Sequence, residues 1–200
     1  MNLQSLIIEI ASYLNVDERE VRLKLINSKE YVAHTTINWI PDTPEITISA
    51  NCLNNGVLAH EITHALMPTK AIFFGEGFAN MMHAYTDKNC NFLFFSEKTL
   101  DEVVVKYYQR DFPFELLLDE NYDNAKMFAI EKFYLMDNRL GYAVAGSFCN
   151  FLLLNYPLIC REIVKRRNFI PSNFLEQFTN LKVKDLKQQW SDTIKCIKVF

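Results

Sequence analysis

The pattern of apolar and polar residues at the start of the chain changes from a helical period to a strand period. Apolar residues at positions 3, 6, 7, 10, 11 and 14 form a helical stripe, which predicts a helix over 3–14. Residues 21–25 and 45–49 alternate between apolar and polar, which predicts two short half-buried strands. Ser28 has the residue type of a helix N-cap, so a short helix is expected to open there, before a turn at residues 41–44.

Helical patterns dominate the rest of the chain. Asn54 and Gly56 precede an apolar period that predicts a helix over 57–67, and Pro68 ends it. A second helix is expected to begin near Glu76 and to run to about residue 85. Further helices are predicted at 99–108, 124–136, 140–156, 158–167, 172–180 and 183–198. The predicted fold class is therefore α+β, with a small N-terminal mixed sheet and a mostly helical C-terminal part.

Composition places the chain among ordinary folded proteins. It has 200 residues, of which 50% are hydrophobic, enough to bury one sizeable core. We expect a single domain of residues 1–200, with an N-terminal lobe of about 1–68 and a helical C-terminal lobe of about 69–200. A net charge of −3 gives no indication of a nucleic-acid partner, and the oligomeric state stays open.

Cysteine usage and the chain's start both favour a cytoplasmic protein. The five cysteines include no C-x-x-C pair, which is typical of reduced core thiols. The first residues lack the basic region of a signal peptide. The apolar stretch 141–160 contains Asn150, Asn155 and Pro157, so it is interpreted as a buried helix, and no membrane contact is expected.

The most informative motif is His60-Glu61-Ile62-Thr63-His64. Histidines four residues apart on a helix lie on one face and can bind one metal ion. A glutamate directly after the first histidine can accept a proton from a water molecule on that metal, the H-E-x-x-H arrangement of zinc hydrolases. The apolar residues Leu58, Ile62, Ala65 and Leu66 occupy the other side of this helix and are expected to anchor it.

A catalytic zinc ion needs a third protein ligand and leaves a fourth position open. Glu76, between Gly75 and Gly77, offers a carboxylate where neighbouring backbone can approach closely. Asn80 and His83 follow Glu76 on the same helical face. Asn80 is therefore a candidate to orient a metal ligand, and His83 a candidate to support the site from behind.

Together these motifs resemble the gluzincin peptidases of clan MA, and within them the compact collagenase-like peptidase domains. The likeness covers roughly residues 45–195, including helices like 141–148 and 183–190. It implies a zincin-like fold, one Zn²⁺ ion bound by His60, His64 and Glu76, and catalysis by Glu61. The chain departs from the pattern at Phe73 and Phe74, where a Trp is common, and at Asn80, where thermolysin-like relatives have Asp.

The resemblance also implies a donor for the oxyanion, commonly Tyr or His. Tyr142 is the first candidate because it heads the helix that resembles the family's, and His83 is the second. Glu61 would take the proton of the attacking water and pass it to the leaving nitrogen. The strand near residues 46–48 and the segment 89–122 are expected to form the walls of the cleft.

Two functions remain open at this point. The first is a zinc-dependent hydrolase of a peptide or other amide bond, with a short peptide, a protein loop or a small amide as substrate. The second is a zincin-shaped regulatory or binding protein that acts on one protein partner and has little or no general peptidase activity. An extended peptide is the default substrate, because sheet edges commonly bind peptides by backbone pairing.

Overall fold

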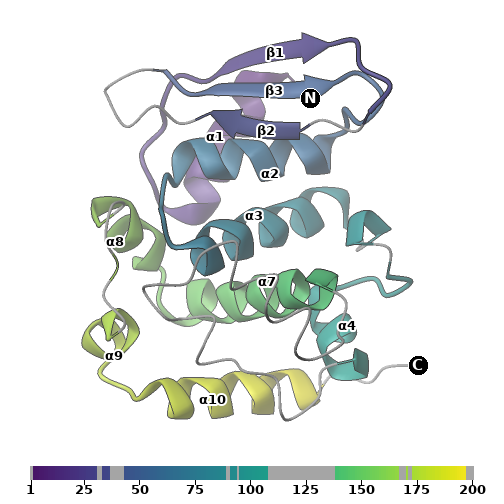
Figure 1. The fold of residues 1–200 in the computed structure, drawn as a ribbon. Coiled ribbons are helices and arrows are strands. Elements are labelled where there is room, and N and C mark those ends of the chain that lie inside the picture. Colours follow the sequence, from purple (N-terminus) through teal and green to yellow (C-terminus); the bar gives the residue numbers. More distant parts are fainter. Residues whose placement is uncertain are drawn as a thin grey trace.

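The fold of this chain, seen in a computed structural model, is α+β and mostly helical, with one small mixed sheet. The structure describes residues 2–30, 33–36, 43–88, 91–93, 95–107, 138–166, 170 and 173–196. Figure 1 shows the sheet above helix α2, with α3, α7 and α10 following below it in successive layers. The central helix of this stack is α3, which packs against α2 on one side and α7 on the other.

The sheet has the strand order β1-β3-β2, comprising β1 (Arg22–Ile26), β2 (Ala33–Thr36) and β3 (Glu45–Ser49). β1 runs parallel to β3 and β2 runs antiparallel to it. β3 is the middle strand, and its Ile46 and Ile48 are fully buried. The two strands predicted from alternation are confirmed, and the mixed sheet with them, but the edge strand β2 was not predicted.

The prediction of a short helix at Ser28 is wrong for the described residues 28–30, which form an irregular bend. Ser28 Oγ accepts a hydrogen bond from the backbone N–H of Glu30 at 3.1 Å. Serine side chains often compete with helical hydrogen bonds in this way. Tyr31 and residues 41 and 42 of the expected turn lie outside the described residues.

Helix α1 (Leu3–Leu14) has the bounds that its apolar stripe predicts, and the side chain of Asn2 caps it by accepting from Ser5 N at 2.7 Å. Helix α2 (Asn55–Leu66) begins with a similar cap, in which Asn54 Oδ1 accepts from Val57 N at 2.8 Å. Helix α3 (Ile72–Asp87) begins four residues before the predicted start. Its first turn buries two adjacent phenylalanines, which gives that turn a place in the core.

The predicted C-terminal helices are confirmed within a few residues at each end. They are α4 (Leu100–Tyr107), α7 (Asn138–Asn155), α8 (Ile159–Lys165), α9 (Phe174–Thr179) and α10 (Val183–Lys195), with a 3₁₀ turn at Asn91–Leu93. α10 packs on α7 through the fully buried Trp190, whose ring centroid lies 5.6 Å from that of Phe148. The helix expected at 124–136 lies outside the described residues.

The apolar stretch within 141–160 is a core helix, as expected, since much of α7 is buried. Across the described residues, no single helix is long and apolar enough to cross a membrane. α7 and α8 meet that criterion only as a pair, which is bent by 108°. Cys52, Cys149 and Cys160 are buried free thiols, but Cys196 is exposed just after α10, so its expected core position is wrong. Cys90 lies outside the described residues.

Candidate metal centre

His60 and His64 project from one face of α2, as their spacing predicts. Their Nε2 atoms lie 3.2 Å apart, and the ring planes are inclined by 75°. Ile62, Ala65 and Leu66 on the opposite side of the helix are buried in the core. The helix is therefore held from behind while both imidazoles face the space between α2 and α3.

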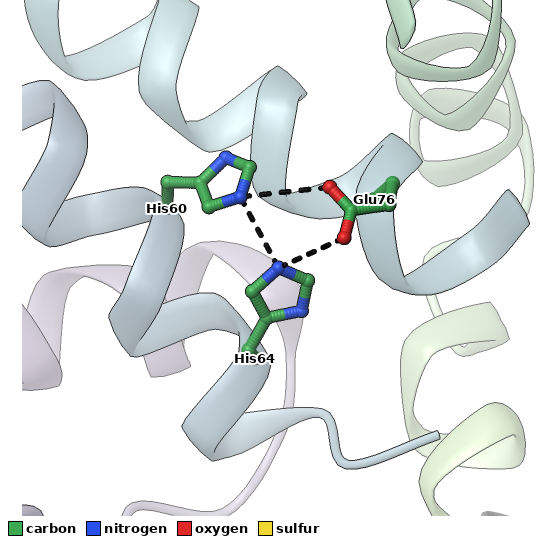
Figure 2. A group of neighbouring side chains, drawn as sticks. All are labelled: His60, His64 and Glu76. Carbon is green, nitrogen blue, oxygen red and sulfur yellow. Dashed lines mark hydrogen bonds and ion pairs between the residues drawn. The ribbon is translucent and has the colours of Figure 1, made fainter. Parts of the chain in front are cut away.

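Glu76 on α3 completes the group, and Figure 2 shows its carboxylate pointing at both imidazoles. Oε2 lies 3.6 Å from His60 Nε2, and Oε1 lies 3.5 Å from His64 Nε2. Ligands about 2.0–2.1 Å from a tetrahedral zinc ion are separated from each other by roughly 3.3 Å. The three separations in the chain, 3.2, 3.5 and 3.6 Å, match that spacing within a few tenths of an ångström.

The protonation tendencies of the three groups suit a metal ion. Burial lowers the pKa of His60 well below its usual value, and the neighbouring His64 and His83 lower it further. Burial also lowers the pKa of His64, so both rings favour the neutral form that binds metals. Burial raises the pKa of Glu76 to about 7. A divalent cation between these groups would offset the cost of the buried Glu76 charge, because it adds a strong positive charge beside it.

Glu61 lies beside the candidate metal ligands and is almost fully buried. Thr35 Oγ1, on strand β2, lies 2.7 Å from Glu61 Oε2 and 2.8 Å from the backbone oxygen of the same residue. Burial raises the pKa of Glu61, and the hydrogen bond from Thr35 works in the opposite direction. One carboxylate oxygen is therefore held by the edge strand, and no described residue hydrogen-bonds to the other, Oε1.

A cavity of about 340 Å³ opens in front of these groups. Its lining comprises the three candidate metal ligands and Glu61, the β2 residues Ala33, His34 and Thr35, and also Thr69, Ile72 and Gly75. The strand beside the cavity is therefore β2, and the expectation that residues 46–48 form the wall is wrong, because Ile46 and Ile48 are buried in the middle strand. Most of the segment 89–122 lies outside the described residues.

The glycines on either side of Glu76 have different roles. A Cβ atom on Gly77 would lie 2.5 Å from Cys149 Sγ and 2.9 Å from the backbone oxygen of Ala145, so α7 packs closely there. A Cβ atom on Gly75 would meet the Thr69 methyl group at 3.4 Å, an ordinary contact. The close approach expected from these glycines is therefore needed at Gly77 only.

Asn80 is buried on the face of α3 that carries Glu76. Its Nδ2 donates to the backbone oxygen of Glu76 at 2.8 Å. This is a bond to the main chain of a candidate ligand residue four positions earlier, a common pattern for such side chains within helices. Asn80 makes no hydrogen bond to His60 or His64, so its expected role in orienting a histidine stays a prediction.

His83 is also buried, with its ring centroid 6.3 Å from that of His60 and the two rings edge to face. Its Nε2 lies 3.3 Å from Asp87 Oδ2, and Asp87 Oδ1 accepts from Gly56 N at 3.1 Å. Asp87 therefore joins the end of α3 to the beginning of α2. Thr35 was not found from the sequence, since its contact with Glu61 joins distant segments. Asp87 was not found either, although its position four residues after His83 on one helix is a signal that the sequence carries.

Tyr142 is not brought into the cavity. It lies one turn before Gly146 on α7, and a Cβ on Gly146 would lie 3.5 Å from Asn80 Cβ. That helix covers the side of α3 opposite α2, where Tyr142 packs against the core. Its role as oxyanion donor therefore stays a prediction that this geometry does not support.

Comparison of the chain with protein-family models, with curated proteins and with solved structures finds no match. The arrangement of the described residues around His60, His64 and Glu76 is thus the basis for any functional conclusion. Within the described residues, this is the group of histidine, cysteine and acidic side chains close enough to hold a metal ion.

Proposed function

We propose that this chain is a zincin-like, zinc-dependent hydrolase of a peptide or other amide bond. The observation that carries the proposal is the convergence of three suitable ligand atoms beside a buried glutamate. His60, His64 and Glu76 come from two helices, and their donor atoms lie 3.2–3.6 Å apart. Glu61 directly follows the first ligand, which is the position of the general base in the resembling peptidases.

The chemistry divides between the metal and the chain. A bound Zn²⁺ ion would polarise the substrate carbonyl and lower the pKa of a water molecule toward about 7. Glu61 would accept a proton from this water as the water oxygen bonds to the carbonyl carbon. Glu61 would then deliver the proton to the nitrogen as the carbon–nitrogen bond breaks, so it returns to its starting form.

The position of β2 favours an extended substrate. β2 is an edge strand, and its residues Ala33 to Thr35 line the cavity. A peptide or a protein loop laid along this edge would receive backbone hydrogen bonds from it, with its carbonyl close to Glu61. A small amide is the second substrate class, since the metal and the base act on the carbonyl alone.

Metal analysis and one substitution test the proposal. Purified protein dialysed against zinc should retain one zinc ion per chain by elemental analysis, and His64→Ala should lose it. Glu61→Gln should keep the zinc ion and lose at least about 10²-fold in turnover of a peptide library, because the base is absent. Glu9→Gln, on an exposed part of α1, is the matched control.

Three results would contradict the hydrolase. They are wild-type turnover by Glu61→Gln, turnover that survives chelation, and one bound zinc ion with no turnover of any peptide or amide. If the chain binds one zinc ion, shows no turnover and co-purifies with a single protein at equal stoichiometry, the regulatory or binding protein with one specific partner would be favoured instead.

A further inference from the structure

A second cavity, of about 430 Å³, lies away from the metal centre and shares no lining residue with it. It is bounded by the end of α1, the second half of α3, the beginning of α4 and the middle of α7. Its volume falls within the roughly 300–1,000 Å³ that small-molecule sites commonly have. The metal hydrolase chemistry makes no use of it.

One wall of this cavity carries a carboxylate with a fixed orientation. Trp190 Nε1 donates to Ser147 Oγ at 2.9 Å, and Ser147 Oγ in turn donates to Asp101 Oδ1. Because an indole N–H can only donate, the serine hydroxyl must use its proton on Asp101. Trp190 and Ser147 are both at most 1% exposed, so this chain of hydrogen bonds is built into the core.

The other oxygen of Asp101, Oδ2, has no hydrogen-bond partner in the described part of the chain, and no cation there pairs with it. Asp101 is nevertheless partly buried, and burial raises its pKa. A half-buried carboxylate without a counter-charge is costly for the protein. A ligand with an ammonium group would supply both a hydrogen-bond donor and an opposite charge.

The remaining lining residues describe the rest of the ligand. Tyr13 and Tyr85 place their ring centroids 4.5 Å apart and offer aromatic surface to an apolar body. Lys88 and Lys98 line the cavity on exposed positions, and neither ammonium group forms an ion pair with a described residue. The lysines and Asp101 together carry one net positive charge, which suits a ligand that also has a carboxylate.

We propose that this cavity binds a small zwitterion, an α-amino acid or a short peptide, with its ammonium group on Asp101 and its carboxylate toward Lys88 and Lys98. Such a ligand matches the charges of the cavity and places its side chain on the tyrosines. The proposal stands on residues outside the metal centre and holds whether or not the chain is a hydrolase.

Calorimetric titration of the full chain tests it with three probes of similar shape. L-Phenylalanine carries both charged groups, phenethylamine only the ammonium group, and 3-phenylpropionate only the carboxylate. We expect L-phenylalanine to bind at least tenfold more tightly than either single-charge probe. The titration is done with and without chelator, since a signal that needs the metal belongs to the metal centre and would overturn the proposal.

Substitutions then locate the binding. Asp101→Asn keeps an oxygen that can accept from Ser147 but removes the charge, so it should weaken L-phenylalanine binding at least tenfold. Lys88→Ala with Lys98→Ala should reduce the affinity to that of phenethylamine. Asp185→Asn and Lys184→Ala, both exposed on α10, are the matched controls. Unchanged binding in Asp101→Asn, equal affinity for phenethylamine and L-phenylalanine, or no binding of any probe would each overturn the proposal.

Discussion

Replacing Thr35 by valine removes one hydroxyl group and changes almost nothing else in shape. In the folded chain this hydroxyl lies 2.7 Å from Glu61 Oε2, and Glu61 is 4% exposed. Water cannot easily replace the lost donor at such a position. A hydrogen bond to a charged group contributes about 1.5–3 kcal/mol, and we expect Thr35→Val to lower the free energy of unfolding by about that amount.

Urea denaturation of the zinc-free protein measures this change without any knowledge of the substrate. Thr35→Ser retains the hydroxyl and should recover most of the loss. Thr36→Val is the matched control, because the next residue on the same strand is exposed and faces the other side of the sheet. If Thr36→Val destabilises as much as Thr35→Val, strand propensity and not the bond to Glu61 explains the effect.

The same substitution should act on hydrolysis. Thr35 is hydrogen-bonded to Glu61, the proposed base, and is not one of the three candidate metal ligands. Zinc content should therefore stay at one ion while Glu61 loses the group that fixes its carboxylate. A loss of about 1.5–3 kcal/mol in the transition state corresponds to a decrease of roughly 10–150-fold in kcat, with little change in KM. Full activity of a zinc-loaded Thr35→Val enzyme, or equal losses in Thr35→Ser, would refute the positioning role.

Three further predictions concern packing, metal and pH. Gly77→Ala should lower the free energy of unfolding by about 1–3 kcal/mol, because the new Cβ would lie 2.5 Å from Cys149 Sγ. Gly141→Ala is the control and should change the free energy of unfolding little, since a Cβ there has nothing within 4 Å. Urea denaturation compares the two variants. Removing zinc by chelation should lower the Tm by about 10 °C, because free zinc at a thousandfold excess over its Kd stabilises the folded state by roughly 4 kcal/mol. An unchanged melting curve would exclude tight binding of zinc to the folded state. Burial lowers the pKa of His83 from 6.5 to about 4 in the folded chain. As the pH falls, the His83 imidazole is therefore protonated in the unfolded chain before it is protonated in the folded chain, and stability is lost between about pH 6.5 and about pH 4. In His83→Gln this part of the pH dependence should vanish from denaturation curves recorded in chelator.

How far the sequence predicts this site depends on how local each contact is. His60 and His64 share a face because helix geometry fixes residues four apart, and no tertiary contact is needed to foresee it. Glu76 was found because a glycine-flanked carboxylate near a helix start is a recognisable pattern. Helix α2 also begins and ends close to signals that a single sequence carries, namely the Asn54 cap and Pro68. Helix α3 has no side-chain cap at its start, and its first four residues were not predicted.

The parts that were missed depend on pairing between distant segments. β2 has four residues, too few for a clear alternating pattern, although Thr35 and Thr36 are residue types favoured in strands. Its place at the edge of the sheet follows from pairing with β3, which no local pattern encodes. The position of Tyr142 away from the lining of the cavity was not foreseen for a related reason, since the side of α3 on which α7 packs cannot be derived from either helix alone.

The packing of α3 links the metal centre to the core behind it. Glu76 faces α2, and the next residue, Gly77, lies directly against α7. A displacement of α3 caused by altered packing against α7 would therefore shift the carboxylate relative to two imidazoles on another helix. Because the three ligand atoms already stand at the spacing of a tetrahedral site, a bound metal ion would join α2 to α3 across their interface. Metal affinity and the stability of the α2–α3–α7 stack are thus expected to rise and fall together, since the same helix positions determine both.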